Sequence, residues 1–209
     1  MKKISKKKHL EMLIQSIPSH QNPKVELEQY STPSTIVADL LWNAYSLGDI
    51  FEKNIMDFGC GNGIFAIASS LLGAKSITAI DIDEDSINFA KNLVLEKKIN
   101  NIEFLIGDSL KFSTNYKYDT LIQNPPFGSQ KKAISGIDTK FIESAIDISN
   151  VIYSFHMAST YEYIFDYFEK LGGKITHEFK YNFPIPKIYD FHEKDLKNVN
   201  VIVFRVENY

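Results

Sequence analysis

The sequence predicts an α/β fold in which a mainly parallel sheet of seven strands carries helices on both faces. Short apolar runs alternate along the chain with longer segments of helical spacing, as in folds built from strand–helix–strand units. The last two expected strands have no helix between them, so they should pair antiparallel. The last strand is then antiparallel to the others and lies inside the sheet, near one edge.

Each element is bounded by local signals. The expected strands cover residues 54–58, 76–82, 102–106, 118–123, 151–156, 174–182 and 199–206. The expected helices cover residues 8–17, 33–47, 63–72, 84–98 and 139–149, with a last one from residue 159 to the glycines at 172 and 173. Thr32, Asp83 and Asp138 are placed to cap three of these helices, and Ser159 with Glu162 has capping-box spacing. Residues 184–198 are too irregular for a helix and are expected to form a long loop.

Length and composition favour one intracellular domain. The 209 residues are 44% hydrophobic and 23% charged, which is ordinary for a globular protein. No apolar run approaches the roughly 18 residues of a membrane helix, and no cleavage site follows the basic N-terminus. The single cysteine, Cys60, excludes an internal disulfide and any multi-cysteine metal site. We expect a cytoplasmic protein without a metal, with a basic arm and helix at 1–30 and a single domain at 31–209.

Charge is concentrated at the N-terminus. The first nine residues hold five lysines and no acid, whereas residues 10–209 carry a net charge of −8. Such a run is either a solvated tail or an arm that binds phosphates. The acidic remainder argues against a broad nucleic-acid surface.

A glycine-rich turn follows the first strand, in NIMDFGCGNGIF at 54–65. Asp57 leads it, and Gly59, Gly61 and Gly63 occupy alternate positions before a helix. Glycines between a strand and a helix permit tight backbone angles and let a ligand lie against the main chain. The alternative is a turn with a purely structural role. Three glycines at alternate positions favour the ligand-binding interpretation over this alternative.

Carboxylates end the next two strands. Asp81 closes the second strand, where an acid can accept hydrogen bonds from both ribose hydroxyls of an adenosine, and its neighbour Ile82 is included in the predicted site. Asp108 ends the third strand and is either a second ligand contact or a plain turn residue.

A stiff segment, NPPF at 124–127, follows the fourth strand. By the switch-point rule it lies at the carboxyl edge of the sheet, beside the ligand. Asn124 supplies a side-chain carbonyl and Pro125 a backbone carbonyl, and Pro126 keeps the turn rigid. Two such acceptors can draw an exocyclic amine toward tetrahedral geometry and free its lone pair, while Phe127 can stack on a flipped-out base. The alternative is a structural turn with a core phenylalanine.

These motifs resemble those of class I S-adenosylmethionine-dependent methyltransferases, with their Rossmann-like fold. The segments LEQYSTPSTIVADLLW, DIDEDSI, NPPFGSQ, GIDTKFIESA and YNFPIPKIYDFHEK narrow the resemblance to the methyltransferase-like-five family. That family implies methylation of adenine N6 in small-subunit ribosomal RNA, with S-adenosylmethionine as cofactor. The cofactor contacts that it implies are Gln29, Thr32, Gly59, Asn62, Ile64, Asp81, Asp108 and Ser109.

The family also implies partners: ribosomal RNA or a ribosomal subunit as substrate, and a small zinc-containing activator protein at the sheet edge, with no membrane. The NPPF motif alone is shared with protein glutamine N5-methyltransferases, so that activity stays open from the residues. A cofactor-binding protein without catalysis, serving in ribosome assembly, is the third possibility, and the intact NPPF motif argues against it.

Overall fold

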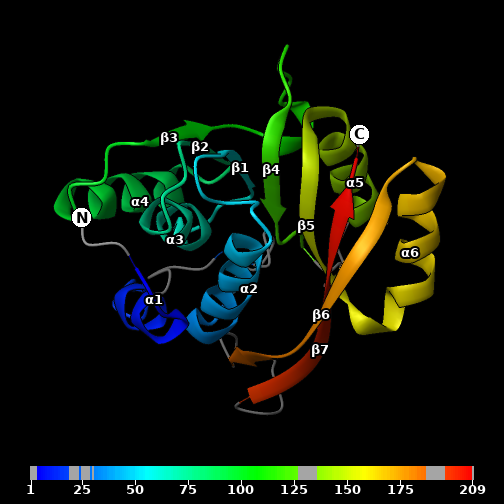
Figure 1. Cartoon of the computed structure of the whole chain (residues 1–209), viewed down its shortest axis with the longest axis horizontal. Helices are drawn as coiled ribbons and strands as arrows, with labels where there is room; N and C mark the ends of the chain where they lie inside the picture. Colours follow the sequence, from blue (N-terminus) through cyan, green and yellow to red (C-terminus); the bar gives the residue numbers. More distant parts are fainter. Residues whose placement is uncertain are drawn as a thin grey trace.

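A single seven-stranded sheet with helices on both faces forms the body of the chain (Figure 1). The computed structural model describes residues 4–18, 24, 29, 31–126, 136–186 and 196–208. The strand order is β3-β2-β1-β4-β5-β7-β6, and β7 is antiparallel to both of its neighbours. The other strands run parallel, so the expected fold class, with one antiparallel strand inside the sheet, is confirmed.

The strands match the expected positions closely. They are β1 Asn54–Phe58, β2 Ser76–Asp81, β3 Ile102–Ile106, β4 Tyr118–Gln123, β5 Ser149–Met157, β6 Lys174–Pro186 and β7 Leu196–Glu207. The α-helices are α1 Lys7–Ile14, α2 Ser34–Ser46, α3 Ile64–Leu71, α4 Glu84–Glu96, α5 Ile137–Ile148 and α6 Tyr161–Lys170, and two short 3-10 helices are η2 Ser109–Lys111 and η3 Ala158–Thr160.

The largest difference concerns the last two strands. They extend to Pro186 and from Leu196, well into the segment that was expected to be a loop. Cross-strand pairing extends this hairpin although prolines interrupt its pattern, and the register runs without a shift from His177–Arg205 to the hairpin's far end. Figure 1 shows the ends of β6 and β7 reaching beyond the other strands.

Helix caps were predicted less well. Gly136, with φ 77°, occupies the N-cap of α5, so Asp138 lies in the first turn rather than at the cap. The Ser159–Glu162 capping box is not formed, because a 3-10 turn intervenes and α6 begins at Tyr161 after Thr160. Helix α2 begins one residue later than expected, after Pro33, and leaves Thr32 outside the helix.

Two hydrophobic clusters pack on the two faces of the sheet. Residues of α1, α2, α3 and α4 form one cluster with inward side chains of the sheet. Residues of α5 and α6 form the other cluster. Ile4 and the buried face of α1, Leu10 and Ile14, belong to the first cluster, so the segment after the first lysines packs into the core. Among the described residues, no helix is both long enough and apolar enough to cross a membrane.

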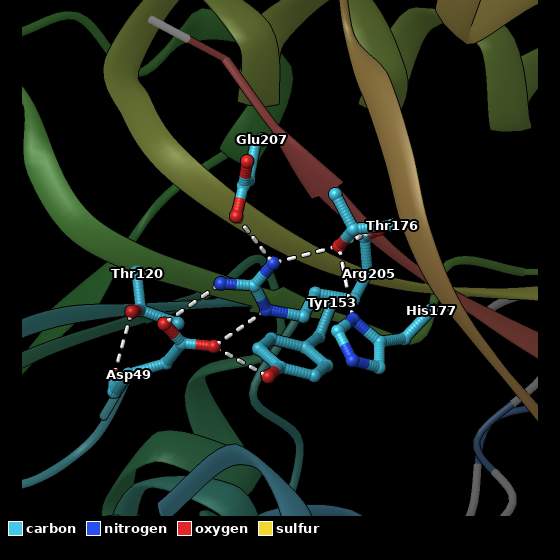
Figure 2. Close-up of polar contacts among 7 residues, drawn as sticks. All are labelled: Asp49, Thr120, Tyr153, Thr176, His177, Arg205 and Glu207. Atoms are coloured by element: carbon cyan, nitrogen blue, oxygen red, sulfur yellow. Dashed lines mark hydrogen bonds and ion pairs between the residues drawn. The ribbon is translucent and has the colours of Figure 1, made fainter. Parts of the chain in front are cut away.

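A buried ion-pair network holds the final hairpin against the rest of the fold (Figure 2). The Arg205 guanidinium donates to both carboxylate oxygens of Asp49, at 2.7 Å and 3.1 Å, and to Glu207 at 2.8 Å. Tyr153 Oη donates to the same Asp49 carboxylate at 2.6 Å. The loop before β1, strand β5 and strand β7 are thereby joined toward the amino ends of the parallel strands.

Candidate active site

The glycine turn after β1 adopts the backbone that its sequence predicted. Gly59, Gly61 and Gly63 have φ values of 67°, 51° and 76°, which an L side chain rarely adopts. The amides of Gly59 and Cys60 both donate to Ile80 O, which ties the turn to the end of β2. A Cβ on Gly59 or Gly61 would meet nothing within 4 Å, so space for a ligand lies over the turn. At Gly63 a Cβ would lie 3.1 Å from Ala90 and 3.3 Å from Phe104, so this glycine permits close packing.

Asp57 lies beneath the turn and is almost completely buried. Its Oδ2 accepts a hydrogen bond from Ala66 N, in the first turn of α3, at 3.0 Å. Burial is the main cause that raises the pKa of this carboxyl group to about 7. The charge of Asp81 raises the pKa further, and the hydrogen bond from Ala66 lowers it. Asp57 is therefore a group whose charge responds to a nearby cation.

Asp81, at the end of β2, is held by the main chain on both oxygens. Gly61 N donates to Oδ2 at 2.8 Å and Asp83 N donates to Oδ1 at 2.9 Å. These two bonds orient the carboxylate. They also join the glycine turn after β1 to the acid at the end of the neighbouring strand β2.

The end of β3 lies beside the end of β2, since Gly107 N donates to Asp81 O at 2.9 Å. Asp108 caps the short helix η2 by accepting from Leu110 N at 3.1 Å, and it also pairs with Lys111 Nζ at 3.4 Å. Ser109 is buried, whereas Ile82 is 57% exposed at the end of β2. The turn interpretation of Asp108 thus has direct support, and Ile82 offers apolar surface at the edge of the site.

Asn124 is positioned by a residue far away in the sequence. Its Nδ2 donates to Thr32 Oγ1 at 3.2 Å, while its Oδ1 is buried and has no hydrogen-bond partner among the described residues. A buried acceptor without a partner costs about 1–3 kcal/mol, and Ser69 Oγ and Gln123 Oε1 are the other such side-chain atoms among the described residues. Asn124 is the one of the three that lies beyond the carboxyl end of a strand. Pro125 is buried and Pro126 is half-buried. Phe127 lies outside the described residues.

Three other predicted site residues have side chains that bind protein groups. Asn62 donates to Pro18 O at 3.1 Å and accepts from Ile64 N at 3.3 Å. The side chain of Ile64 packs in the core. Gln29 donates to Asp83 Oδ2 at 2.9 Å and accepts from Lys24 N at 2.7 Å. Contacts of Asn62 and Ile64 with a ligand would therefore come from their backbone.

Sequence reasoning missed two relationships at this edge. Thr32 was interpreted as a helix cap and a cofactor contact, and its bond to Asn124 was not foreseen. Asp83 occupies the N-cap position of α4 as expected, but its side chain forms no capping bond. Its carboxylate binds Gln29, Ser86 and Lys24 and so holds part of the N-terminal segment. The signal for Thr32 was its place at the start of a helix that precedes β1. Such a helix runs against the strands, so its N-terminus lies at their carboxyl edge.

A buried polar chain lies on the other side of β4. Gln123 Nε2 donates to Ser154 Oγ at 2.9 Å, and Ser154 Oγ lies 2.7 Å from His156 Nε2. Burial lowers the pKa of His156 to about 3, so the ring is neutral. The serine then donates to Nε2 while it accepts from Gln123. His156 is therefore a structural histidine in this network.

Comparison with known proteins provides an independent line of evidence. The Methyltransferase small domain family matches residues 36–149, which contain the glycine turn, both strand-ending acids and Asn124. MJ0284 of Methanocaldococcus jannaschii is 39% identical over 213 residues, covering 97% of this chain and 94% of its own. The rRNA N(6)-adenosine-methyltransferase Mettl5 of Drosophila melanogaster is 34% identical, covering 97% of this chain and 96% of its own.

The fold agrees with these relationships. The crystal structure of PH1948 from Pyrococcus horikoshii superposes with a TM-score of 0.87 at 35% identity, over 98% of both chains. The similarity thus includes the N-terminal segment and the final hairpin as well as the central domain. The chain belongs to the Methyltransferase small domain family, together with the METTL5 methyltransferases, and is a class I S-adenosylmethionine-dependent methyltransferase.

Proposed function

We propose that this enzyme methylates the exocyclic N6 of an adenosine in small-subunit ribosomal RNA, in the cytoplasm. The observation that carries the proposal is the buried, unpartnered Oδ1 of Asn124 at the carboxyl edge of β4. An amide oxygen can accept a hydrogen bond from an amine N–H, which is the contact that an adenine amino group offers. The names of the METTL5 relatives supply the substrate class.

The residues at this edge fit S-adenosylmethionine. The space over Gly59 and Gly61 admits a ligand against the main chain, and Asp81 is oriented to accept from ribose hydroxyls. Asp57 lies below, where the positive charge of the cofactor would favour its ionised form. When bound, the cofactor supplies an electrophilic methyl group on a sulfonium. The assignment of cofactor contacts to Asp57, Asp81, Ile82, Asp108, Ser109 and the glycine turn is part of the proposal.

Asn124 and the Pro125 carbonyl would act on the amine. Two acceptors on its hydrogens hold the nitrogen in line with the methyl group and reduce delocalisation of its lone pair into the ring. The methylated nitrogen becomes cationic and acidic, so water can take the proton. Asparagine suffices because no strong base is needed, and much of the rate would come from positioning. Phe127 is proposed to stack on the base.

The test is methylation of defined substrates. The purified enzyme is incubated with labelled S-adenosylmethionine and either ribosomal subunits, naked ribosomal RNA or ribosomal proteins and release factors, and the products are digested to nucleosides or amino acids. We expect label in N6-methyladenosine from small-subunit RNA. Asn124→Ala should reduce kcat at least a hundredfold with cofactor affinity near that of the parent, and labelled methylglutamine instead would overturn the proposal.

A protein partner is also proposed. Strand β3 forms one edge of the sheet, and Ile106 on it and Leu95 on α4 are 50% and 73% exposed. Edge strands expose unpaired backbone groups that another chain can pair with. A small zinc-containing activator that pairs with β3 would cover this surface. Ile106→Lys should weaken such a complex in size-exclusion chromatography, while the same change at exposed Leu13 on α1 should leave it intact.

A further inference from the structure

A pocket lies on the β6–β7 hairpin, outside the site described above. Its volume is about 580 Å³, within the usual range for small-ligand sites. Its lining residues are Ala158, Tyr161, Lys180, Tyr181, Asn182, Asn200, Val201 and Ile202. We propose that this hairpin pocket binds a nucleotide that flanks the target adenosine; this inference rests on the proposed RNA substrate.

The hairpin is anchored on one face and open on the other. Phe183 and Val199 are buried in the core cluster shared with α1 and α2. Because side chains alternate along a strand, their neighbours Asn182 and Asn200 point to the opposite face, where both are exposed. The two asparagines are direct partners in the antiparallel register, so their amides lie side by side. The pocket thus lies on the face of the hairpin opposite Phe183 and Val199.

The chemistry of the lining fits a nucleotide. The side-chain amides of Asn182 and Asn200 form no hydrogen bond within the described residues, so two carboxamides are available to donate to and accept from a base edge. Lys180, two residues before Asn182 on the same face, is exposed and forms no ion pair within the described part of the chain, so it can contact a phosphate. The hydroxyl of Tyr161 donates to Glu178 at 2.6 Å, which leaves its ring as the contact surface.

The position of the pocket suits a flanking nucleotide. Asn200 is adjacent in β7 to Val201, which pairs with Met157 at the end of β5. Strand β5 lies directly beside β4, and Gln123, the residue before Asn124, pairs with Ser154. With strands about 4.8 Å apart, two strand spacings separate β4 from β7, and Asn200 lies three residues beyond the level of Asn124 along the strands, so the two positions are roughly 14 Å apart. A short run of single-stranded nucleotides can span that distance.

The test uses the full chain and RNA fragments of different length. Labelled S-adenosylmethionine first maps the methylated adenosine, and fragments then carry it with long flanks, a shortened 5′ flank or a shortened 3′ flank. On long fragments we expect Asn182→Ala/Asn200→Ala to raise KM about fivefold with kcat within twofold of the parent. Lys180→Gln should raise KM about threefold and reduce the salt slope by roughly one phosphate contact. On one of the two shortened fragments, the KM values of these variants should equal that of the parent.

The matched control is Lys174→Gln, at the opposite end of β6, which should behave as the parent does. Thermal unfolding of each variant shows whether the hairpin is intact; both asparagines are exposed, so we expect no change. If the parent methylates RNA and the pocket variants match it on every fragment, the inference is wrong and the proposed function stands. If the parent labels only protein, the proposed function fails, whatever the variants do.

Discussion

Thr32 holds the side-chain amide of Asn124 through a hydrogen bond of 3.2 Å, and the oxygen of the same amide is buried without a partner among the described residues. In this arrangement the hydroxyl accepts from Nδ2, and Oδ1 is the end of the amide that is left as an acceptor. An amide that rotated by 180° would present a donor there instead. We propose that Thr32 helps to keep the amide in the observed orientation without touching the reacting atoms.

Thr32→Val should reduce kcat for RNA about five- to tenfold, since a hydrogen bond contributes about 1 kcal/mol and an unfixed amide samples the wrong orientation. KM for RNA should change less than twofold. Thr32→Ser retains the hydroxyl and should restore kcat to near the parent value. Steady-state kinetics with cofactor affinity from calorimetry separates this effect from a direct cofactor contact. Parent-like kcat in Thr32→Val would show that Thr32 does not position the amide.

Cofactor affinity should rise with pH through neutrality. The pKa of Asp57 is raised to about 7 by burial, so this group is mostly protonated at pH 6 and mostly ionised at pH 8. A cationic ligand favours the ionised form, so binding should tighten by up to roughly tenfold between these pH values and release a proton. Calorimetry in two buffers of different ionisation enthalpy measures that proton. Asp57→Asn should bind with little pH dependence, and proton release by this variant would assign the effect to another group.

Asp57 and His156 should contribute opposite pH dependences to folding stability. The folded pKa of His156, about 3, lies below its usual value of 6.5, so the unfolded chain binds the extra proton and stability is lost as pH falls below about 6.5. The folded pKa of Asp57 lies above its usual value of 3.8, so its contribution falls as pH rises from about 4 to 7. Between about pH 4 and 6.5 the two slopes oppose each other, each at most about 1.4 kcal/mol per pH unit.

Urea unfolding of single variants separates these contributions. From pH 4.5 to 6.5, Asp57→Asn should show stability that rises more steeply with pH than in the parent, because the His156 slope is then unopposed. His156→Gln should show the reverse trend. Identical slopes in all three proteins would mean that neither group titrates differently in the folded and unfolded states.

The Asp49–Arg205 ion pair should contribute to folding stability and not to the catalytic rate. Asp49→Ala leaves the guanidinium buried without its main partner, which should cost about 3–5 kcal/mol of unfolding free energy. Asp49→Leu/Arg205→Met, which removes both charges, should cost less than Asp49→Ala alone. Tyr153→Phe, which removes one hydrogen bond to Asp49, should cost about 1 kcal/mol. Chemical denaturation of the parent and the three variants measures their free energies of unfolding. At a temperature where all four proteins are folded, kcat of the variants should stay near the parent value.

The N-terminal lysines divide into two groups. Lys6 and Lys8 are exposed, whereas Lys7 pairs with Asp39 at 2.7 Å. Deletion of residues 1–8 would remove that pair and buried Ile4, so it mixes stability with RNA binding. Lys6→Gln/Lys8→Gln is the cleaner change, and it should raise KM for RNA and flatten its salt dependence. Lys7→Gln, as the contrast, should lower stability slightly; if the double variant keeps the salt slope of the parent, these two lysines do not bind RNA.

Patterns within a few residues were sufficient to predict most of the fold. Strands β1, β3 and β4 occupy the expected residues, because apolar runs bounded by glycine, proline or polar residues report local backbone preference and burial together. The glycine turn was predictable for the same reason, since a positive φ at Gly59, Gly61 and Gly63 is a local property of the backbone. Antiparallel pairing of the last strands followed from the absence of a crossover helix.

Contacts between residues far apart in the sequence could not be predicted from such local patterns. Thr32 and Asn124 are 92 residues apart, and Asp49 and Arg205 are 156 apart, so their pairing depends on how α2 and β7 pack against the sheet. The caps of α5 and α6 were misplaced because the observed N-cap residues, Gly136 and Thr160, form no side-chain capping bond, so capping signals in the sequence did not determine where these helices begin. The sequence thus predicted which polar residues lie near the carboxyl edge, because strand ends are local features, whereas long-range packing decided their hydrogen-bond partners and left Asn124 Oδ1 without one among the described residues.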